Sequence, residues 1–90
     1  MTTITVTHTK ENTYSVLVHE TSSQTTHTVT LTDELWETLT HKICSKEHLI
    51  GQSFHFLLKR EPKESILSTF DVSIISTYFP EYKEIITTLL

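Results

Sequence analysis

The first third of the chain alternates hydrophobic and polar residues with a period of two, which is typical of β-strands. Polar segments at 9–12 (TKEN) and 20–25 (ETSSQT) divide it into three such runs. The pattern predicts a three-stranded antiparallel β-meander over residues 2–31. One face would carry Ile4, Val6, His8, Tyr14, Val16, Val18, His27, Val29 and Leu31.

The strand register is constrained because each strand must keep its apolar residues on the same face. We predict that Val6 pairs with Val16 in the first hairpin, and that Val16 pairs with Val29 in the second. Both registers place every apolar residue on one side of the sheet. We expect the second strand to be central, the first and third to be edges, and the Thr-rich face to be solvated.

After Leu31 the hydrophobic period changes to that of an α-helix. Thr32 and Ser45 are favourable N-caps, and they predict helices over residues 33–43 and 46–60. The second of these helices has an unusually broad apolar arc. We therefore expect it to be the central helix, in contact with other elements on two sides.

The rest of the chain is divided by Pro62, Asp71 and Pro80. Proline favours the first position of a helix and aspartate favours the N-cap. These residues predict one short helix from Pro62 through Leu67, another from 72 to 79, and a last one from Pro80. The complete prediction is a single α+β domain over residues 1–90, with the meander followed by four to five helices packed on one face.

Composition excludes several classes of function. Seven Lys and Arg against 11 Asp and Glu give a net charge of −4, which opposes binding to nucleic acids or anionic membranes by bulk charge. The apolar runs are too short to span a membrane. The single cysteine and the polar N-terminus favour a reducing, cytoplasmic location.

Histidine and cysteine are the residues that suggest metal binding or catalysis. His41, Cys44 and His48 have suitable ligand types, but no carboxylate or second cysteine completes a tetrahedral set at short spacing. His27 has Thr and Val as its expected neighbours, which provide no activated nucleophile. We therefore assign no catalytic, cofactor or metal residue. A metal protein or an enzyme using His and Cys is the third hypothesis.

The leading hypothesis is a small non-enzymatic protein-interaction or regulatory module. Trp36 lies one position off the apolar stripe of its helix, and tyrosines flank Pro80. Exposed aromatic and arginine side chains are enriched at binding hot spots. The candidate interaction surface comprises Trp36, Arg60, Glu61, Tyr78 and Tyr82. Its partner would be another protein or a second copy, since the Thr-rich strands offer at least one unpaired edge.

The alternative is nucleic-acid binding through a helix-turn-helix-like pair at 62–79. Lys59, Arg60 and Lys63 would then contact phosphates. The second helix of that pair contains no Arg, Asn or Gln for a bidentate base contact. Two glutamates also interrupt the three cations, so the sequence favours a packed corner over a phosphate-binding track.

The segment FLLKREPKESIL, followed by YFPEY, resembles a phrase in a group of small, uncharacterised bacterial proteins. The resemblance lies between residues 54 and 82 and implies a bacterial, cytoplasmic origin. It implies no activity, cofactor or catalytic residue. The matching residues are Phe56, Leu57, Leu58, Arg60, Glu61, Pro62, Ser65, Ile66, Leu67, Tyr78, Phe79, Pro80, Glu81 and Tyr82.

Overall fold

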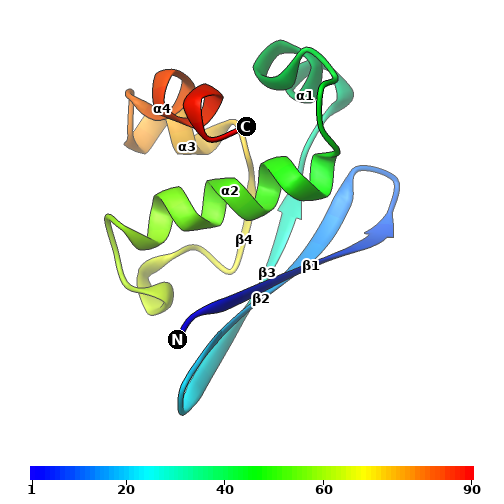
Figure 1. Ribbon diagram of the computed structural model, residues 1–90. Helices are drawn as coiled ribbons and strands as arrows, with labels where there is room; N and C mark the ends of the chain where they lie inside the picture. Colours follow the sequence, from blue (N-terminus) through cyan, green and yellow to red (C-terminus); the bar gives the residue numbers. More distant parts are fainter.

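A computed structural model describes residues 1–90 and shows an α+β fold with a mixed four-stranded sheet. Strands β1 (Thr3–Lys10), β2 (Thr13–Glu20) and β3 (Ser23–Thr30) form the predicted antiparallel meander. A fourth strand, β4 (Thr69–Asp71), pairs parallel with β3, so that the order is β1-β2-β3-β4. Figure 1 shows the helices gathered on one side of this sheet.

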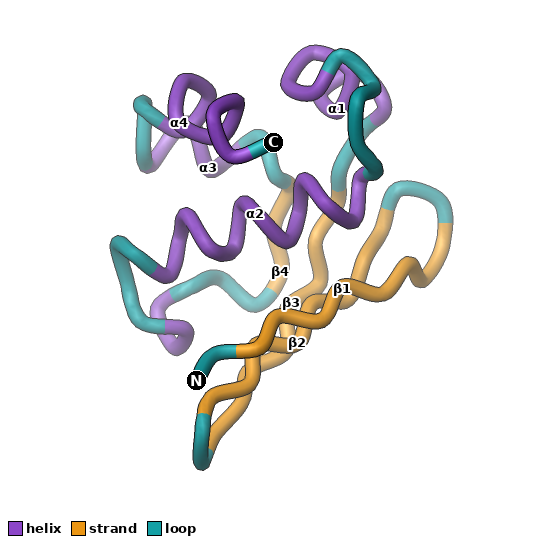
Figure 2. Tube along the Cα trace, in the orientation of Figure 1, coloured by secondary structure: helices purple, strands orange, loops and turns teal.

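Four α-helices and one 3-10 turn complete the chain. They are α1 (Asp33–Thr40), α2 (Lys46–Leu58), the turn η1 (Lys63–Ser65), α3 (Ile74–Tyr78) and α4 (Tyr82–Leu89). Helix α2 lies between the sheet and the pair α3 and α4 (Figure 2). None of the helices combines the length and the hydrophobicity that a membrane span requires.

The register of the first hairpin is confirmed, whereas that of the second is corrected. Val6 pairs with Val16, as predicted. Val16 pairs with His27 and not with Val29, because a two-residue turn at 21–22 joins β2 to β3 in place of a longer loop. A shift of two residues leaves the same side chains on the inner face, so the apolar pattern could not distinguish the two registers.

Strand β4 corrects the prediction that β3 is an edge. Phe70 pairs with Val29 and is only 9% exposed, so the short strand adds a large side chain to the inner face. The backbone N–H of Thr28 donates to the carbonyl of Ser68 at 2.7 Å and extends this pairing. A strand of three residues has too few positions to show a period of two.

The expected helix from Pro62 through Leu67 is not formed. Only the 3-10 turn η1 follows Pro62, and Ile66 is already extended, with φ −74° and ψ 133°. Asp71 lies in β4, where its carboxylate accepts a hydrogen bond from the N–H of Ser73 at 2.9 Å. It caps this tight turn, and α3 begins only at residue 74.

Helix α2 is the centre of the hydrophobic core, as predicted. Phe54 lies against His27 and Phe70 of the sheet, with ring centroids 5.3 and 6.0 Å apart respectively. Phe56 points the other way and packs edge-on against Tyr82 at 5.3 Å. The helix buries six side chains on its two covered sides: Leu49, Ile50, Ser53, Phe54, Phe56 and Leu57.

Candidate functional site: an apolar pocket beside the end of α2

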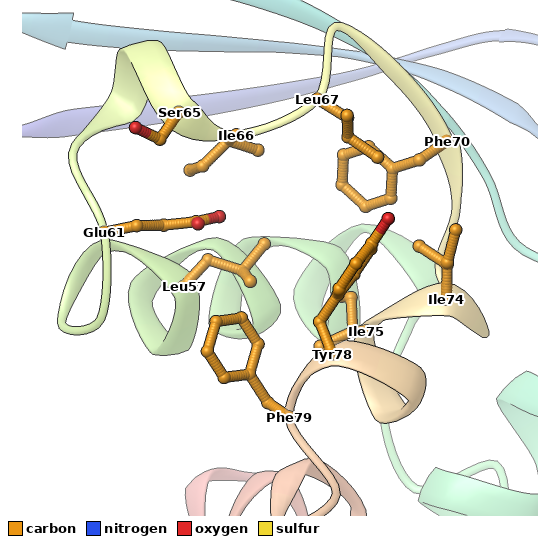
Figure 3. Close-up of a pocket in the computed structure, with 10 residues that line it drawn as sticks. All are labelled: Leu57, Glu61, Ser65, Ile66, Leu67, Phe70, Ile74, Ile75, Tyr78 and Phe79. Carbon is orange, nitrogen blue, oxygen red and sulfur yellow. The ribbon is translucent and has the colours of Figure 1, made fainter.

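A pocket of about 390 Å³ opens between the end of α2, the segment after it and α3. Eight of its ten lining residues are hydrophobic. We call it the α2–α3 pocket, and Figure 3 shows how its side chains converge. Its lining consists of Leu57, Glu61, Ser65, Ile66, Leu67, Phe70, Ile74, Ile75, Tyr78 and Phe79.

The pocket exists because the chain leaves α2 abruptly and returns extended. Pro62 has no backbone N–H and cannot continue the helix, so the segment after it turns away from the α2 axis. The extended stretch that follows η1 runs back to β4, and the gap between this stretch and α3 is the pocket (Figure 3). Side chains from four separate parts of the chain line this gap.

The floor of the pocket is buried, while its rim exposes large apolar side chains. Leu57 and Ile75 at the floor are 4% and 2% exposed. Leu67 and Tyr78 are 46% and 62% exposed, and both line the pocket. Two of the most exposed hydrophobic residues of the domain therefore lie beside one cavity, and its volume is in the range of ligand pockets.

The polar lining is small and is dominated by one carboxylate. Glu61 extends into the opening between Ile66 and Leu57, and Tyr78 stands on the opposite side (Figure 3). No side-chain hydrogen bond or ion pair engages Glu61 in this structure. The pocket thus presents an unpaired negative charge next to an apolar surface.

The neighbouring cation does not neutralise Glu61, because it is already engaged. Arg60 Nε donates to the carboxylate of Glu81 at 3.2 Å, and the guanidinium lies 3.6 Å from the ring centroid of Phe56. Arg60 also donates to the Phe56 carbonyl at 3.2 Å. These contacts hold the end of α2 against the start of α4.

A buried histidine holds the upper wall of the pocket. His27 is 2% exposed, and its Nδ1 lies 2.7 Å from the carbonyl oxygen of Leu67. A carbonyl can only accept, so Nδ1 carries a proton. Nε2 lies 2.8 Å from the hydroxyl of Thr25. The sequence indicated that His27 faces inward, but it gave no sign that this residue fixes the segment carrying Leu67.

A buried lysine holds the turn at the other end of that wall. The Lys63 side chain is 3% exposed, and its Nζ donates to Glu20 at 2.7 Å and to Glu64 at 2.5 Å. The hydrogen bond to Glu20 raises the pKa of Lys63, and the bond to Glu64 raises it further. Lys63 thus ties η1 to the end of β2.

The structure separates the five predicted interaction residues. Glu61 and Tyr78 line the pocket, and Arg60 lies next to it in the turn that follows α2. Trp36 lies elsewhere, where its indole N–H donates to the Cys44 carbonyl at 2.8 Å and holds the α1–α2 connection. Tyr82 lies in the core and not on the surface.

Tyr82 belongs to the core and cannot contribute to a surface. It is fully buried, and its hydroxyl lies 2.6 Å from that of Ser53. Burial raises its pKa to about 12. The residue follows Pro80 in an otherwise polar stretch, and only its packing against α2 reveals this role.

The residues predicted for metal binding and for nucleic-acid binding are not assembled into a site. No group of three or more His, Cys, Asp or Glu residues is placed to hold a metal ion, so His41, Cys44 and His48 do not form one. The helix pair expected at 62–79 is absent, because η1 and β4 occupy its first half. Lys63, which was expected to contact phosphate, is buried between two carboxylates.

Comparison of the chain with models of protein families, with curated proteins and with solved structures finds no match.

Proposed function

We propose that this domain is a non-enzymatic protein-interaction module that binds a short segment of a partner protein in the α2–α3 pocket. The observation that supports this proposal is the exposure of Leu67 and Tyr78 at the rim of a largely apolar cavity. Burying such side chains against a partner is favourable in proportion to the apolar area removed from water. Tyrosine also offers a rigid, amphipathic contact surface.

The negative charge of Glu61 at the pocket opening favours a positively charged residue in the partner segment. A partner that covered Glu61 with apolar groups alone would remove a carboxylate from water without compensation, which is costly. A lysine or arginine beside the inserted apolar side chain would instead pair with Glu61. We therefore propose a segment in which a Leu, Ile or Phe is flanked by a basic residue.

An array of capped heptapeptides tests this function directly. Each peptide would carry Leu or Phe at its centre, with Lys, Ala or Glu on either side. We expect the wild-type domain to prefer the Lys-flanked peptides. Because a partly exposed ion pair contributes about 0.2–1 kcal/mol, Glu61→Gln should weaken their binding by about 1.4- to fivefold.

Two further variants locate the binding surface. Tyr78→Ala removes an exposed side chain from the pocket rim and should weaken binding to all peptides. Leu89→Ala truncates a hydrophobic residue that is 36% exposed on α4 and lies outside the pocket lining, so it should leave binding unchanged. A preference for Glu-flanked peptides, or equal binding by Tyr78→Ala and wild type, would contradict the proposal.

A further inference from the structure

The outer edge of β1 has no neighbouring strand, although helix α2 packs against β1. The strand has eight residues and contains no proline or glycine. Lys10, at its end, is its only Lys, Arg, Asp or Glu residue. Natural edge strands are usually blunted by proline, charge, bulges or shortness. The only irregularity of β1 lies between His8 and Lys10, so residues 3–7 remain regular. β1 is the first strand in the order of the sheet and pairs only with β2 (Figure 1).

The backbone groups that point outward follow from the hydrogen bonds on the far side of the sheet. Thr28 and Thr30 of β3 bond toward the β4 side, at 2.7 and 2.9 Å. In antiparallel pairing, alternate residues bond to opposite neighbours, so Val29 bonds to β2. Val29 pairs with Tyr14, and Tyr14 therefore directs its N–H and C=O toward β3.

The direction of the backbone hydrogen bonds alternates in the same way along β2 and β1. Leu17 is an odd number of positions from Tyr14, so it bonds toward β1, where its partner is Thr5. The N–H and C=O of Thr5 are thus used within the sheet. Those of Ile4 and Val6 point outward, and no backbone or side-chain hydrogen bond from a loop reaches them.

The side chains at this edge are incompletely covered. Val16 and Val18 of β2 are fully buried, whereas Ile4 and Val6, their partners on β1, are only half-buried. Both residues point to the inner face of the sheet and pack against the core from its margin. The edge therefore combines free hydrogen-bonding groups with two apolar side chains that a neighbouring strand would cover.

We infer that a second copy of this chain adds to the sheet through β1, antiparallel and with a two-fold axis at Thr5. In this register Ile4 lies opposite Val6 of the second copy, and the reverse pair repeats on the other side of the axis. Both pairs join residues whose N–H and C=O point outward, so each pair exchanges two hydrogen bonds. A two-fold interface must be self-complementary in this way.

The outer face is equally compatible with this register. Thr5 lies opposite Thr5 of the second copy, and Thr3 lies opposite Thr7, so no like charges meet near the axis. An axis at Val6 would instead place Ile4 opposite His8 and lose one of the apolar matches. The β4 edge is less suited to such pairing because it has only three residues.

A charge-exchange experiment at Thr5 tests the inference. The two Thr5 residues that meet at the axis form a non-hydrogen-bonded pair. Cross-strand side chains come closest at such pairs. We expect wild type to sediment at twice the chain mass at high micromolar concentration. Thr5→Lys and Thr5→Glu should each sediment at one chain mass, because two like charges meet. Their equimolar mixture should recover the dimer.

Thr26→Lys is the matched control. Thr26 lies in the same cross-strand row as Thr5, on the outer face of β3 and two strands from the axis. Circular dichroism would verify that all variants fold, since Thr5 and Thr26 are both exposed. A monomeric wild type, a dimer that persists in Thr5→Lys, or equal dissociation by Thr26→Lys would overturn the inference. These outcomes are independent of peptide binding in the α2–α3 pocket.

Discussion

Tyr82 was predicted from the sequence to be an interaction residue, whereas the structure buries it in the core. Its neighbours Glu81 and Lys83 are polar, and a tyrosine two residues after a proline is compatible with an exposed recognition site. In the fold, its ring packs edge-on against Phe56 and its hydroxyl meets Ser53, both from α2. Such contacts join residues far apart in the chain, so no local pattern predicts them.

Removing the Tyr82 hydroxyl should have a moderate effect on stability. In Tyr82→Phe, Ser53 keeps its hydrogen bond to the Leu49 carbonyl at 2.8 Å, so no buried group loses every partner. We expect the free energy of unfolding to fall by about 1 kcal/mol, the usual net contribution of one hydrogen bond. Urea unfolding measures this change. In the double variant Tyr82→Phe/Ser53→Ala, the loss of stability should be much smaller than the sum of the two single losses. A loss equal to that sum would contradict a direct hydrogen bond between the two residues.

The same residue predicts a loss of stability at alkaline pH. Burial raises the pKa of Tyr82 from 10.0 to about 12, so between these values the unfolded chain loses a proton that the folded chain keeps. Stability is therefore complete below pH 10 and declines as pH rises toward 12, by about 2 kcal/mol. Urea midpoints measured across this range should fall less steeply in Tyr82→Phe. Equal slopes for the two proteins would contradict this origin.

At the scale of elements, the starts of the first two helices were predictable and their ends were not, whereas the later helix starts at Pro62, residue 72 and Pro80 were wrong. Thr32 and Ser45 cap α1 and α2 as expected, accepting from backbone N–H groups at 3.2 and 3.0 Å. Helix α1 ends earlier than predicted, where His41 adopts φ 51°. N-caps are specified by their own side chains, whereas helix ends depend on where the following chain must go.

The shortened helix η1 and the missed strand β4 share a physical cause. Each has three residues, too few to carry a hydrophobic period. Strand β4 forms by parallel pairing with β3, about 40 residues earlier in the chain. Both elements are held by distant partners, since Lys63 of η1 donates to Glu20 and β4 pairs with β3.

Helix α2 contains the only glycine of the chain, and this position offers a gain in stability. A Cβ atom placed at Gly51 would meet no other atom within 4 Å. Because glycine costs a helix interior about 0.5–1 kcal/mol relative to alanine, Gly51→Ala should raise the free energy of unfolding by that amount. Thermal and urea unfolding would measure the gain. A lower stability than wild type would show that the glycine is required for packing.

For the whole molecule, the sequence predicted the class of fold better than the site. The first hairpin, the central helix and the side of the sheet that is covered all follow from periodicity. Of the predicted interaction residues, Glu61 and Tyr78 line the α2–α3 pocket, whereas Trp36 and Tyr82 have packing roles. The pocket is assembled from separate segments after the Pro62 corner, so the sequence could mark its position but not its shape.

The pocket and the β1 edge are distinct parts of the same molecule. The pocket lies between α2 and α3, while the edge lies on the far side of the sheet order from β4. Pairing through β1 would leave the pocket residues uninvolved in that contact. A dimer would then present two pockets, and a partner with two suitable segments would bind more tightly than either segment alone.

The most direct test of the proposed function is NMR titration of the ¹⁵N-labelled domain with two matched capped peptides, AFKLA and AFELA. We predict that AFKLA shifts the amide signals of Leu57, Glu61, Leu67 and Tyr78, and that AFELA shifts them much less at the same concentration. Glu61→Gln should reduce the difference between the two peptides. Shifts that lie outside the α2–α3 pocket, or equal responses to both peptides, would contradict the account.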